Sequence, residues 1–185
     1  LEGGRPVGRR DLLDAFLWYP ACVINPCWDV LAWNTACACV FGDYASKQGQ
    51  ERNTIWRLFF DPSWREQVVD WEREARKAVA IFRFNTRQYV GEPWFDQFVA
   101  ELVAGSSEFA AWWAQHDIQV RHDERKVLHH PTVGRLVIQP TTLQLVGAPE
   151  LRLVVDMPLA EEDTLQKLQR LVGGVQRGID MALVI

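Results

Sequence analysis

The sequence has no long hydrophobic run and no leader-like N-terminus, although 48% of its 185 residues are hydrophobic. No apolar run approaches the ~18 residues that a membrane-spanning helix needs, and no apolar segment follows Leu1–Arg5 as it would in a signal peptide. We therefore expect a cytoplasmic protein with no membrane partner. Because the chain does not begin with Met, we also expect it to be a fragment or a processed chain.

Cysteine is scarce as well. The four cysteines are Cys22, Cys27, Cys37 and Cys39, and no two of them have the CxxC spacing that is typical of a zinc site. In a cytosolic protein such residues are most often small buried hydrophobes. One alternative stays open, a redox sensor that uses either Cys37 with Cys39 or Cys22 with Cys27.

Motifs of catalysis and metal binding are also missing. The adjacent pair His129 and His130 belongs to no ligand-spacing motif, and His130 before Pro131 is typical of a residue at a strand end that bonds to backbone. Ser106 and Ser107 lie outside any GxSxG context. We therefore expect no metal, no cofactor and no enzymatic activity.

Basic charge is in the minority. Lys and Arg number 20 against 24 Asp and Glu, which gives a net charge of −4. A DNA-binding domain usually presents a basic face, so we do not expect these residues to bind DNA themselves. The balance still allows a DNA-binding domain that precedes this chain.

Aromatic residues, in contrast, are abundant, with nine Trp and nine Phe. Such side chains are large and costly to expose, so they indicate either a very aromatic core or an aromatic-lined cavity. The content of charged residues, 24%, and the hydrophobic content together exclude a disordered tail.

The periodicity predicts two strands, a helical middle and three further strands, followed by a helix. Asn25-Pro26 marks a turn inside a hairpin over residues 21–33, and Asp61-Pro62 is a strong helix start. The predicted helices cover residues 10–18, 35–41 (with Asn34 as N-cap), 53–60, 62–83, 93–103, 108–115 and 161–172. The alternating runs lie at residues 118–120, 127–129, 136–145 and 151–155.

This order predicts an α+β fold in which helices cover one face of a five-stranded antiparallel sheet, with a large helical insertion between strands 2 and 3. By analogy, the same order of elements is that of the Per-Arnt-Sim (PAS) sensor fold. We expect one domain over residues 1–172, followed by a tail, residues 173–185, that has no clear pattern.

Short sequence pieces at consistent spacing resemble the ligand-binding domain of MmyB-like bacterial transcription regulators. In the first half they are Asp29–Asn34, Arg52-Asn53, Phe60-Asp61-Pro62 with Arg65, and Asp70-Trp71-Glu72 with Ala75-Arg76. In the second half they are Glu101-Leu102, Glu108-Phe109, Trp113, His116, Lys126, His130-Pro131 and Val133-Gly134. The resemblance covers about residues 10–172.

The resemblance implies a PAS-like domain that accommodates a fatty acid in an apolar cavity and follows an Xre-type helix-turn-helix DNA-binding domain. This sequence departs from the pattern in lacking the helix-turn-helix segment, so any contact with DNA is expected only through that missing domain. It also has a Trp pair, Trp112-Trp113, where one Trp is expected, and an unfamiliar tail after Val172.

Simple energetics favour a lipid-like ligand. Each buried methylene contributes ~0.8 kcal/mol, so a chain of about twelve methylenes gains roughly 10 kcal/mol before ordering costs. The residues predicted to line the cavity are Trp71, Ala75, Val79 and Phe82, followed by Trp33, Phe59 and Phe60. The alternative is that these residues form an ordinary core.

The head group of such a ligand needs a cationic partner, and Arg binds a carboxylate best as a two-pronged donor. The candidates are Arg52, Arg65 and Arg76, and Asn53 could add an amide donor. Alternatively, each arginine is a solvated surface charge or pairs with a neighbouring acid, as Glu72 and Arg76 could do at helical spacing.

Two hypotheses of function follow. The first is a sensor that binds a fatty acid or similar amphiphile and signals to the attached DNA-binding domain. The second is a PAS-like dimerisation or interaction module that has a solid aromatic core and takes no ligand. A homodimer is possible under either hypothesis.

Overall fold

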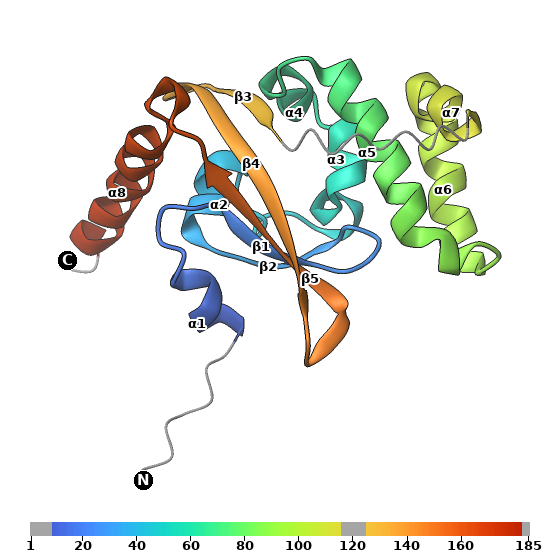
Figure 1. Cartoon of the computed structure of the whole chain (residues 1–185), viewed down its shortest axis with the longest axis horizontal. Helices are drawn as coiled ribbons and strands as arrows, with labels where there is room; N and C mark the ends of the chain where they lie inside the picture. Colours follow the sequence, from blue (N-terminus) through green and yellow to red (C-terminus); the bar gives the residue numbers. More distant parts are fainter. Residues whose placement is uncertain (1–8, 116–124, 183–185) are drawn as a thin grey trace, which may run out of the picture.

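The computed structural model describes residues 9–115 and 125–182, which form a five-stranded antiparallel sheet and a set of helices (Figure 1). The sheet has the order β2-β1-β5-β4-β3. Its strands are β1 (Ala21–Ile24), β2 (Val30–Trp33), β3 (Lys126–His130), β4 (Gly134–Leu145) and β5 (Ala148–Pro158). The predicted α+β class is thus confirmed.

A long helical segment separates β2 from β3, as the sequence predicted. Its helices are α2 (Thr35–Phe41), η1 (Gly49–Arg52), α3 (Thr54–Phe60), α4 (Pro62–Gln67), α5 (Trp71–Thr86), η2 (Arg87–Tyr89), α6 (Pro93–Gly105) and α7 (Ser107–Ala114). The chain begins with α1 (Arg9–Asp14) and ends with η3 (Glu161–Asp163) and α8 (Thr164–Ala182). No helix in the described ranges is long and apolar enough to span a bilayer.

Side-chain caps explain why several helices begin where they do. Asn34 accepts a hydrogen bond from the Cys37 amide (2.9 Å), and Asn53 accepts one from the Trp56 amide (3.0 Å). Asp61 accepts from the Ser63 amide (3.1 Å) ahead of Pro62, and Ser106 caps α7. The predicted roles of Asn34 as a cap and of Asp61-Pro62 as a helix start are confirmed.

The prediction of a single helix over residues 62–83 is wrong. The chain leaves helical geometry after Gln67, and Asp70 adopts a left-handed conformation (φ 57°, ψ 51°) before α5 begins. The reason is a strand partner distant in sequence: Val68 forms a β-bridge with Leu128, and the Val69 amide donates to the Val127 carbonyl (3.0 Å). Trp64 and Val68 therefore do not share a helix face with Trp71.

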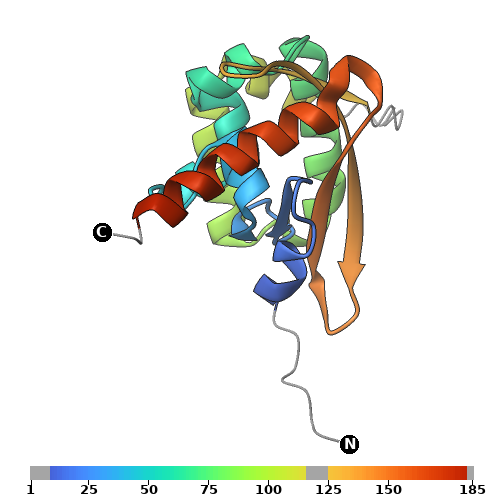
Figure 2. The same ribbon diagram turned by 90° about the vertical axis from the view of Figure 1, so that its left-hand side faces the viewer.

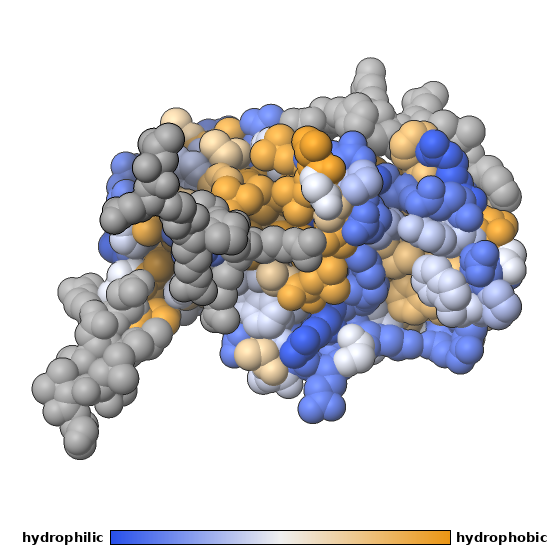
Figure 3. All heavy atoms as spheres, turned by 90° about the horizontal axis from the view of Figure 1, so that it is seen from below, coloured by the Kyte–Doolittle hydropathy of each residue, from blue (hydrophilic) through white to orange (hydrophobic). Residues whose placement is uncertain are grey.

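The helices other than α1 form successive layers on one face of the sheet, which we call the inner face. Helices α3 and α5 lie beyond the sheet, α6 and α7 pack outside α5, and α8 crosses at the opposite end (Figures 1 and 2). A separate apolar cluster, which includes Leu13, Val23 and Leu153, lies where α1 covers part of the outer face. Seen from below, apolar side chains gather toward the strands, whereas the end with α6 and α7 is mostly hydrophilic (Figure 3).

The C-terminal helix is longer than the sequence predicted. The helix predicted over residues 161–172 begins with η3 and continues as α8 to Ala182, so Gly173 and Gly174 lie inside a helix. Most of the tail without a clear pattern is thus helical. The alternating run at residues 118–120 lies outside the described residues.

Candidate ligand-binding site

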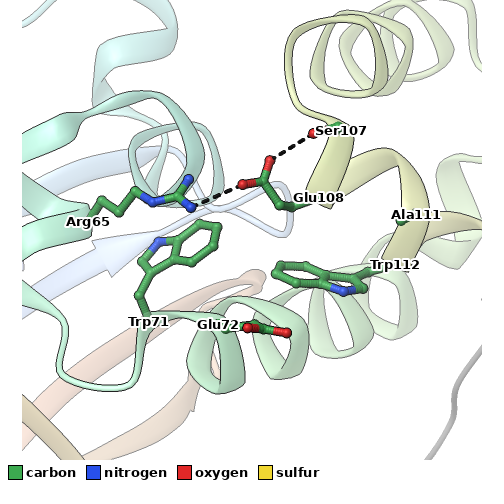
Figure 4. A pocket seen from close by; sticks show the side chains of 7 residues that line it. All are labelled: Arg65, Trp71, Glu72, Ser107, Glu108, Ala111 and Trp112. Carbon is green, nitrogen blue, oxygen red and sulfur yellow. Dashed lines mark hydrogen bonds and ion pairs between the residues drawn. The ribbon is translucent and has the colours of Figure 1, made fainter.

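A hollow of about 380 Å³ opens between α7 on one side and α4 with the start of α5 on the other (Figure 4). We call it the α5–α7 hollow. It is lined by Arg65, Trp71, Glu72, Ser107, Glu108, Ala111 and Trp112. Its volume lies within the range of small-molecule sites, roughly 300–1,000 Å³. Two of the predicted site residues, Arg65 and Trp71, meet there.

Trp71 lies between a guanidinium and a second indole. The Arg65 Cζ atom is 3.7 Å from the centre of the Trp71 ring, within the range of a cation–π contact, and the Trp112 ring centre is 5.8 Å away. The Trp71 Nε1–H donates to the Leu58 carbonyl at 2.7 Å, which fixes the orientation of the ring. The hollow therefore presents a fixed aromatic surface beside a cation.

The Arg65 guanidinium also bridges α4 to α7 through Glu108. Its Nη2 lies 3.0 Å from Glu108 Oε1, and the two side chains are 48% and 37% exposed. The pKa of Glu108 is lowered to about 2, first by a hydrogen bond from its own backbone amide and then by Arg65. An ion pair this exposed contributes up to ~1 kcal/mol, so separating α7 from α4 at this point costs little.

Farther along α7, aromatic rings close the interface with α3 and α5. Phe109 packs edge-on against Phe59, with ring centres 5.2 Å apart, and stacks on Trp113 at 5.5 Å. Trp113 in turn contacts Phe82, with ring centres 6.2 Å apart. The α5–α7 hollow thus continues inward as an aromatic interface, not as an open channel.

The predicted lining face of α5 is filled by neighbouring side chains in this structure. Ala75, Val79 and Phe82 are 0%, 1% and 0% exposed, and all three belong to the main apolar core. None of them lines the α5–α7 hollow. Their part in binding a ligand stays a prediction that requires α7 to move.

Trp33 and Arg52 meet each other at a different place. The Arg52 Cζ lies 5.8 Å from the Trp33 ring centre, and its Nε donates to the Lys47 carbonyl (2.8 Å). The Trp33 ring lies beside Tyr44, 5.4 Å between centres. Neither residue lines the α5–α7 hollow.

Asn53, Phe60 and Arg76 have structural contacts of their own. Asn53 caps α3, and its Nδ2 donates to the Cys27 carbonyl (2.7 Å) and to Asp29 Oδ1 (2.8 Å). Phe60 stacks on Trp56, 5.2 Å between ring centres. Arg76 donates from Nη2 to Gln115 Oε1 at 3.1 Å. These three residues also lie outside the α5–α7 hollow.

Sequence reasoning missed Arg57, which is 2% exposed. Its guanidinium lies 4.4 Å from the Trp64 ring centre, and its Nε and Nη2 both donate to Asp61 (3.1 and 3.0 Å). Its Nη1 is buried without a hydrogen-bond partner. The spacing of four residues between Arg57 and Asp61 is the signal that could have found this pair.

The contacts of Cys37 and His130 indicate structural roles for these residues. Cys37 forms a side-chain hydrogen bond with Cys22, and this bond together with burial raises the pKa of Cys37 well above its usual value. A raised pKa keeps a thiol protonated and poorly reactive. His130 Nε2 lies 3.0 Å from the Cys39 carbonyl, so its predicted bond to backbone is confirmed. The side chains that the structure describes include no group of three or more that could hold a metal ion.

A comparison with protein families agrees with the resemblance seen in the sequence. A family model described as the MmyB-like transcription regulator ligand binding domain matches residues 6–171. This range includes every residue of the α5–α7 hollow. No curated protein matches the chain.

Proposed function

Because the chain belongs to the family of MmyB-like transcription regulator ligand-binding domains, we propose that it senses a fatty acid or a similar amphiphile. Occupancy would then be signalled to an attached Xre-type helix-turn-helix DNA-binding domain. One observation carries the proposal: the Arg65 guanidinium lies on Trp71 at the mouth of a hollow that leads into the aromatic α5–α7 interface.

The head group would exchange with Glu108. A carboxylate is the natural acceptor for a guanidinium, and Glu108 occupies that position in this structure. Glu72 and Glu108 both line the hollow with one basic side chain, Arg65, so an incoming anion needs Glu108 to leave. The exposed Arg65–Glu108 pair is weak enough for this exchange.

The acyl chain would follow the aromatic rings inward. It would enter between α5 and α7, where Trp71, Phe59 and Phe109 offer apolar surface, and each methylene buried there contributes ~0.8 kcal/mol. About twelve methylenes supply roughly 10 kcal/mol before ordering costs, and this gain acts against the loss of the contacts that α7 makes in the closed state.

Helices α6 and α7 are the moving part in this proposal. Besides the Arg65–Glu108 pair, a hydrogen bond from Gln50 to Glu101 holds α6 against η1. Both polar contacts are exposed and weak, so the main opposition to a displacement of the two helices is the aromatic packing of Phe109 and Trp113. A ligand that binds the displaced arrangement better than the closed one would shift the population between them.

Native mass spectrometry and thermal unfolding test the proposal. The purified protein is first freed of lipid by denaturing extraction and refolding, and C12–C18 fatty acids are then added. We expect a one-to-one complex and a raised Tm, both weakened in Arg65→Gln. Arg73→Gln is the matched control, because Arg73 is also exposed and ion-paired but lies outside the hollow. No bound fatty acid and no shift in Tm would contradict the proposal.

A second candidate is a dimerisation module without a ligand. The close packing around Ala75, Val79 and Phe82 favours this candidate, because it predicts a solid core there. Exposed apolar side chains near the β4–β5 turn also favour it, namely Leu143 (49% exposed) and Val146 (99% exposed). Leu143 pairs in register with Leu153 of the outer-face cluster. Sedimentation over a range of concentrations tests this candidate: it predicts a dimer that Leu143→Glu dissociates, and a monomer at all concentrations contradicts it.

A further inference from the structure

A second hollow of about 380 Å³ lies where the β1–β2 turn, η1 and α6 meet. We call it the Asp29 hollow. It is lined by Cys27, Asp29, Gly49, Gln50, Asn53, Trp94 and Phe98. Its lining has a carboxylate and two aromatic rings but no basic side chain. We propose that the Asp29 hollow binds a small organic cation of the alkylammonium class.

The carboxylate of Asp29 is held in place before any ligand arrives. Its Oδ2 accepts from Asn25 Nδ2 at 2.7 Å, and its Oδ1 accepts from Asn53 Nδ2 at 2.8 Å. Asn53 is itself 1% exposed and held as the cap of α3. Both partners are neutral amides, and none of the ion pairs among the described residues involves Asp29. The negative charge is therefore fixed in position and left without a neutralising cation.

The α6 side of the hollow supplies the aromatic surface. Trp94 is 50% exposed, and its ring is steadied by Tyr89 and Phe95, with ring centres 5.4 and 5.7 Å away. Phe98 follows one turn later on the same helix. An ammonium group near the face of an indole is attracted by the negative charge of the ring face, and the nearby carboxylate adds to this attraction.

The surroundings strengthen the preference for a cation. Glu101 places a second carboxylate beside the hollow, because it accepts hydrogen bonds from Gln50, which lines the hollow, and from Gln97. Burial and the charge of Asp29 raise the pKa of the Cys27 thiol to about 11, so Cys27 contributes no charge. A fatty-acid head group would be repelled here. The proposal does not require a ligand in the α5–α7 hollow, but it uses the closed position of α6, because Gln50 of η1 and both Trp94 and Phe98 of α6 line the Asp29 hollow.

The test compares choline with its neutral isostere, 3,3-dimethylbutan-1-ol, by NMR titration of the Trp94 indole N–H, which is assigned from the spectrum of Trp94→Leu. We expect choline to shift this signal in a saturable way and the neutral alcohol to bind several-fold more weakly. In Trp94→Leu, choline affinity measured by calorimetry should fall by ~3- to 30-fold, the range of a cation–π contact.

Phe84→Leu is the matched control, because Phe84 is an exposed aromatic residue (61%) on another helix and should leave choline binding unchanged. Asp29→Asn should reduce binding as well. If that variant fails to fold, the isostere comparison and Trp94→Leu still decide the question. Equal binding of choline and the alcohol, or unchanged affinity in Trp94→Leu, would overturn the proposal.

Discussion

The Arg65 guanidinium lies 3.7 Å from the Trp71 ring centre while it pairs with Glu108 across the gap to α7. One arginine thus marks both the mouth of the α5–α7 hollow and the contact that holds α7 closed. A ligand carboxylate that takes the place of Glu108 would keep the cation–π contact and release α7. In the proposed function, binding and movement are thereby linked at a single side chain.

Removing the charge of Glu108 should favour the ligand. In Glu108→Gln the carboxylate that competes for Arg65 is gone, so dodecanoate affinity should rise about two- to fivefold, the equivalent of an exposed ion pair. Isothermal titration calorimetry measures the change. Glu66→Gln is the control, because it removes an exposed carboxylate from α4 outside the hollow. Unchanged or reduced affinity would count against the exchange at Arg65.

The filled core around Phe82 should be sensitive to truncation. Phe82 is 0% exposed and contacts Trp28, Phe95, Phe98 and Trp113. Phe82→Ala should lower the free energy of unfolding by about 3–5 kcal/mol, as measured by urea titration. Phe84→Ala, on the same helix but exposed, should change it by less than about 0.5 kcal/mol. Similar values for the two variants would mean that this face of α5 is not packed.

Gly105 permits the close approach of α6 to α3. A Cβ atom added to Gly105 would lie 2.6 Å from Cε1 of Phe60, so the ring or the helix would have to shift. We expect Gly105→Ala to lower the free energy of unfolding by about 1–3 kcal/mol. Gly174→Ala is the control: Gly174 is exposed inside α8 with open space around it, and the variant should be stabilised by about 0.5–1 kcal/mol. Urea titration of both variants distinguishes these outcomes, and a stabilised Gly105→Ala contradicts the packing.

Asp156 should make stability depend on pH. Burial raises the pKa of its carboxyl from 3.8 to about 6, although the nearby charge of Lys126 opposes the shift. The folded state therefore holds a proton that the unfolded state has released, so this stabilisation is full below about pH 4 and is lost as pH rises through 6. The loss amounts to about 3 kcal/mol.

Asp156→Asn isolates that effect, because an amide does not titrate. Its free energy of unfolding should match that of the original protein near pH 4 and exceed it by about 3 kcal/mol near pH 8, measured by urea titration at each pH. A constant difference across this range would show that Asp156 titrates normally.

The sequence was most informative where structure is local. Asn34, Asp61 with Pro62 and the alternation in β4 acted through neighbours a few residues away, so α2 and β4 lie where they were predicted and α4 begins where it was predicted. The break between α4 and α5 could not be foreseen in this way. It depends on the bridge from Val68 to Leu128, a residue sixty positions farther along the chain.

The site was predictable to a similar extent. Arg65 and Trp71 were chosen for their chemistry, and the structure brings them together. Phe109 and Trp113 of α7 cover the α5 face through tertiary contacts, which helical periodicity cannot predict. Arg57 was overlooked because it lies inside an apolar run, where its burial depends on Asp61 and Trp64 from the following turn and helix.

A crystal structure of the protein with dodecanoate is the decisive test of the proposed fatty-acid site. We expect the carboxylate within ~3 Å of the Arg65 guanidinium, Glu108 displaced, and the acyl chain between α5 and α7 beside Trp71. A carboxylate bound elsewhere, or crystals soaked in dodecanoate with α7 closed and Arg65 still paired to Glu108, would contradict it.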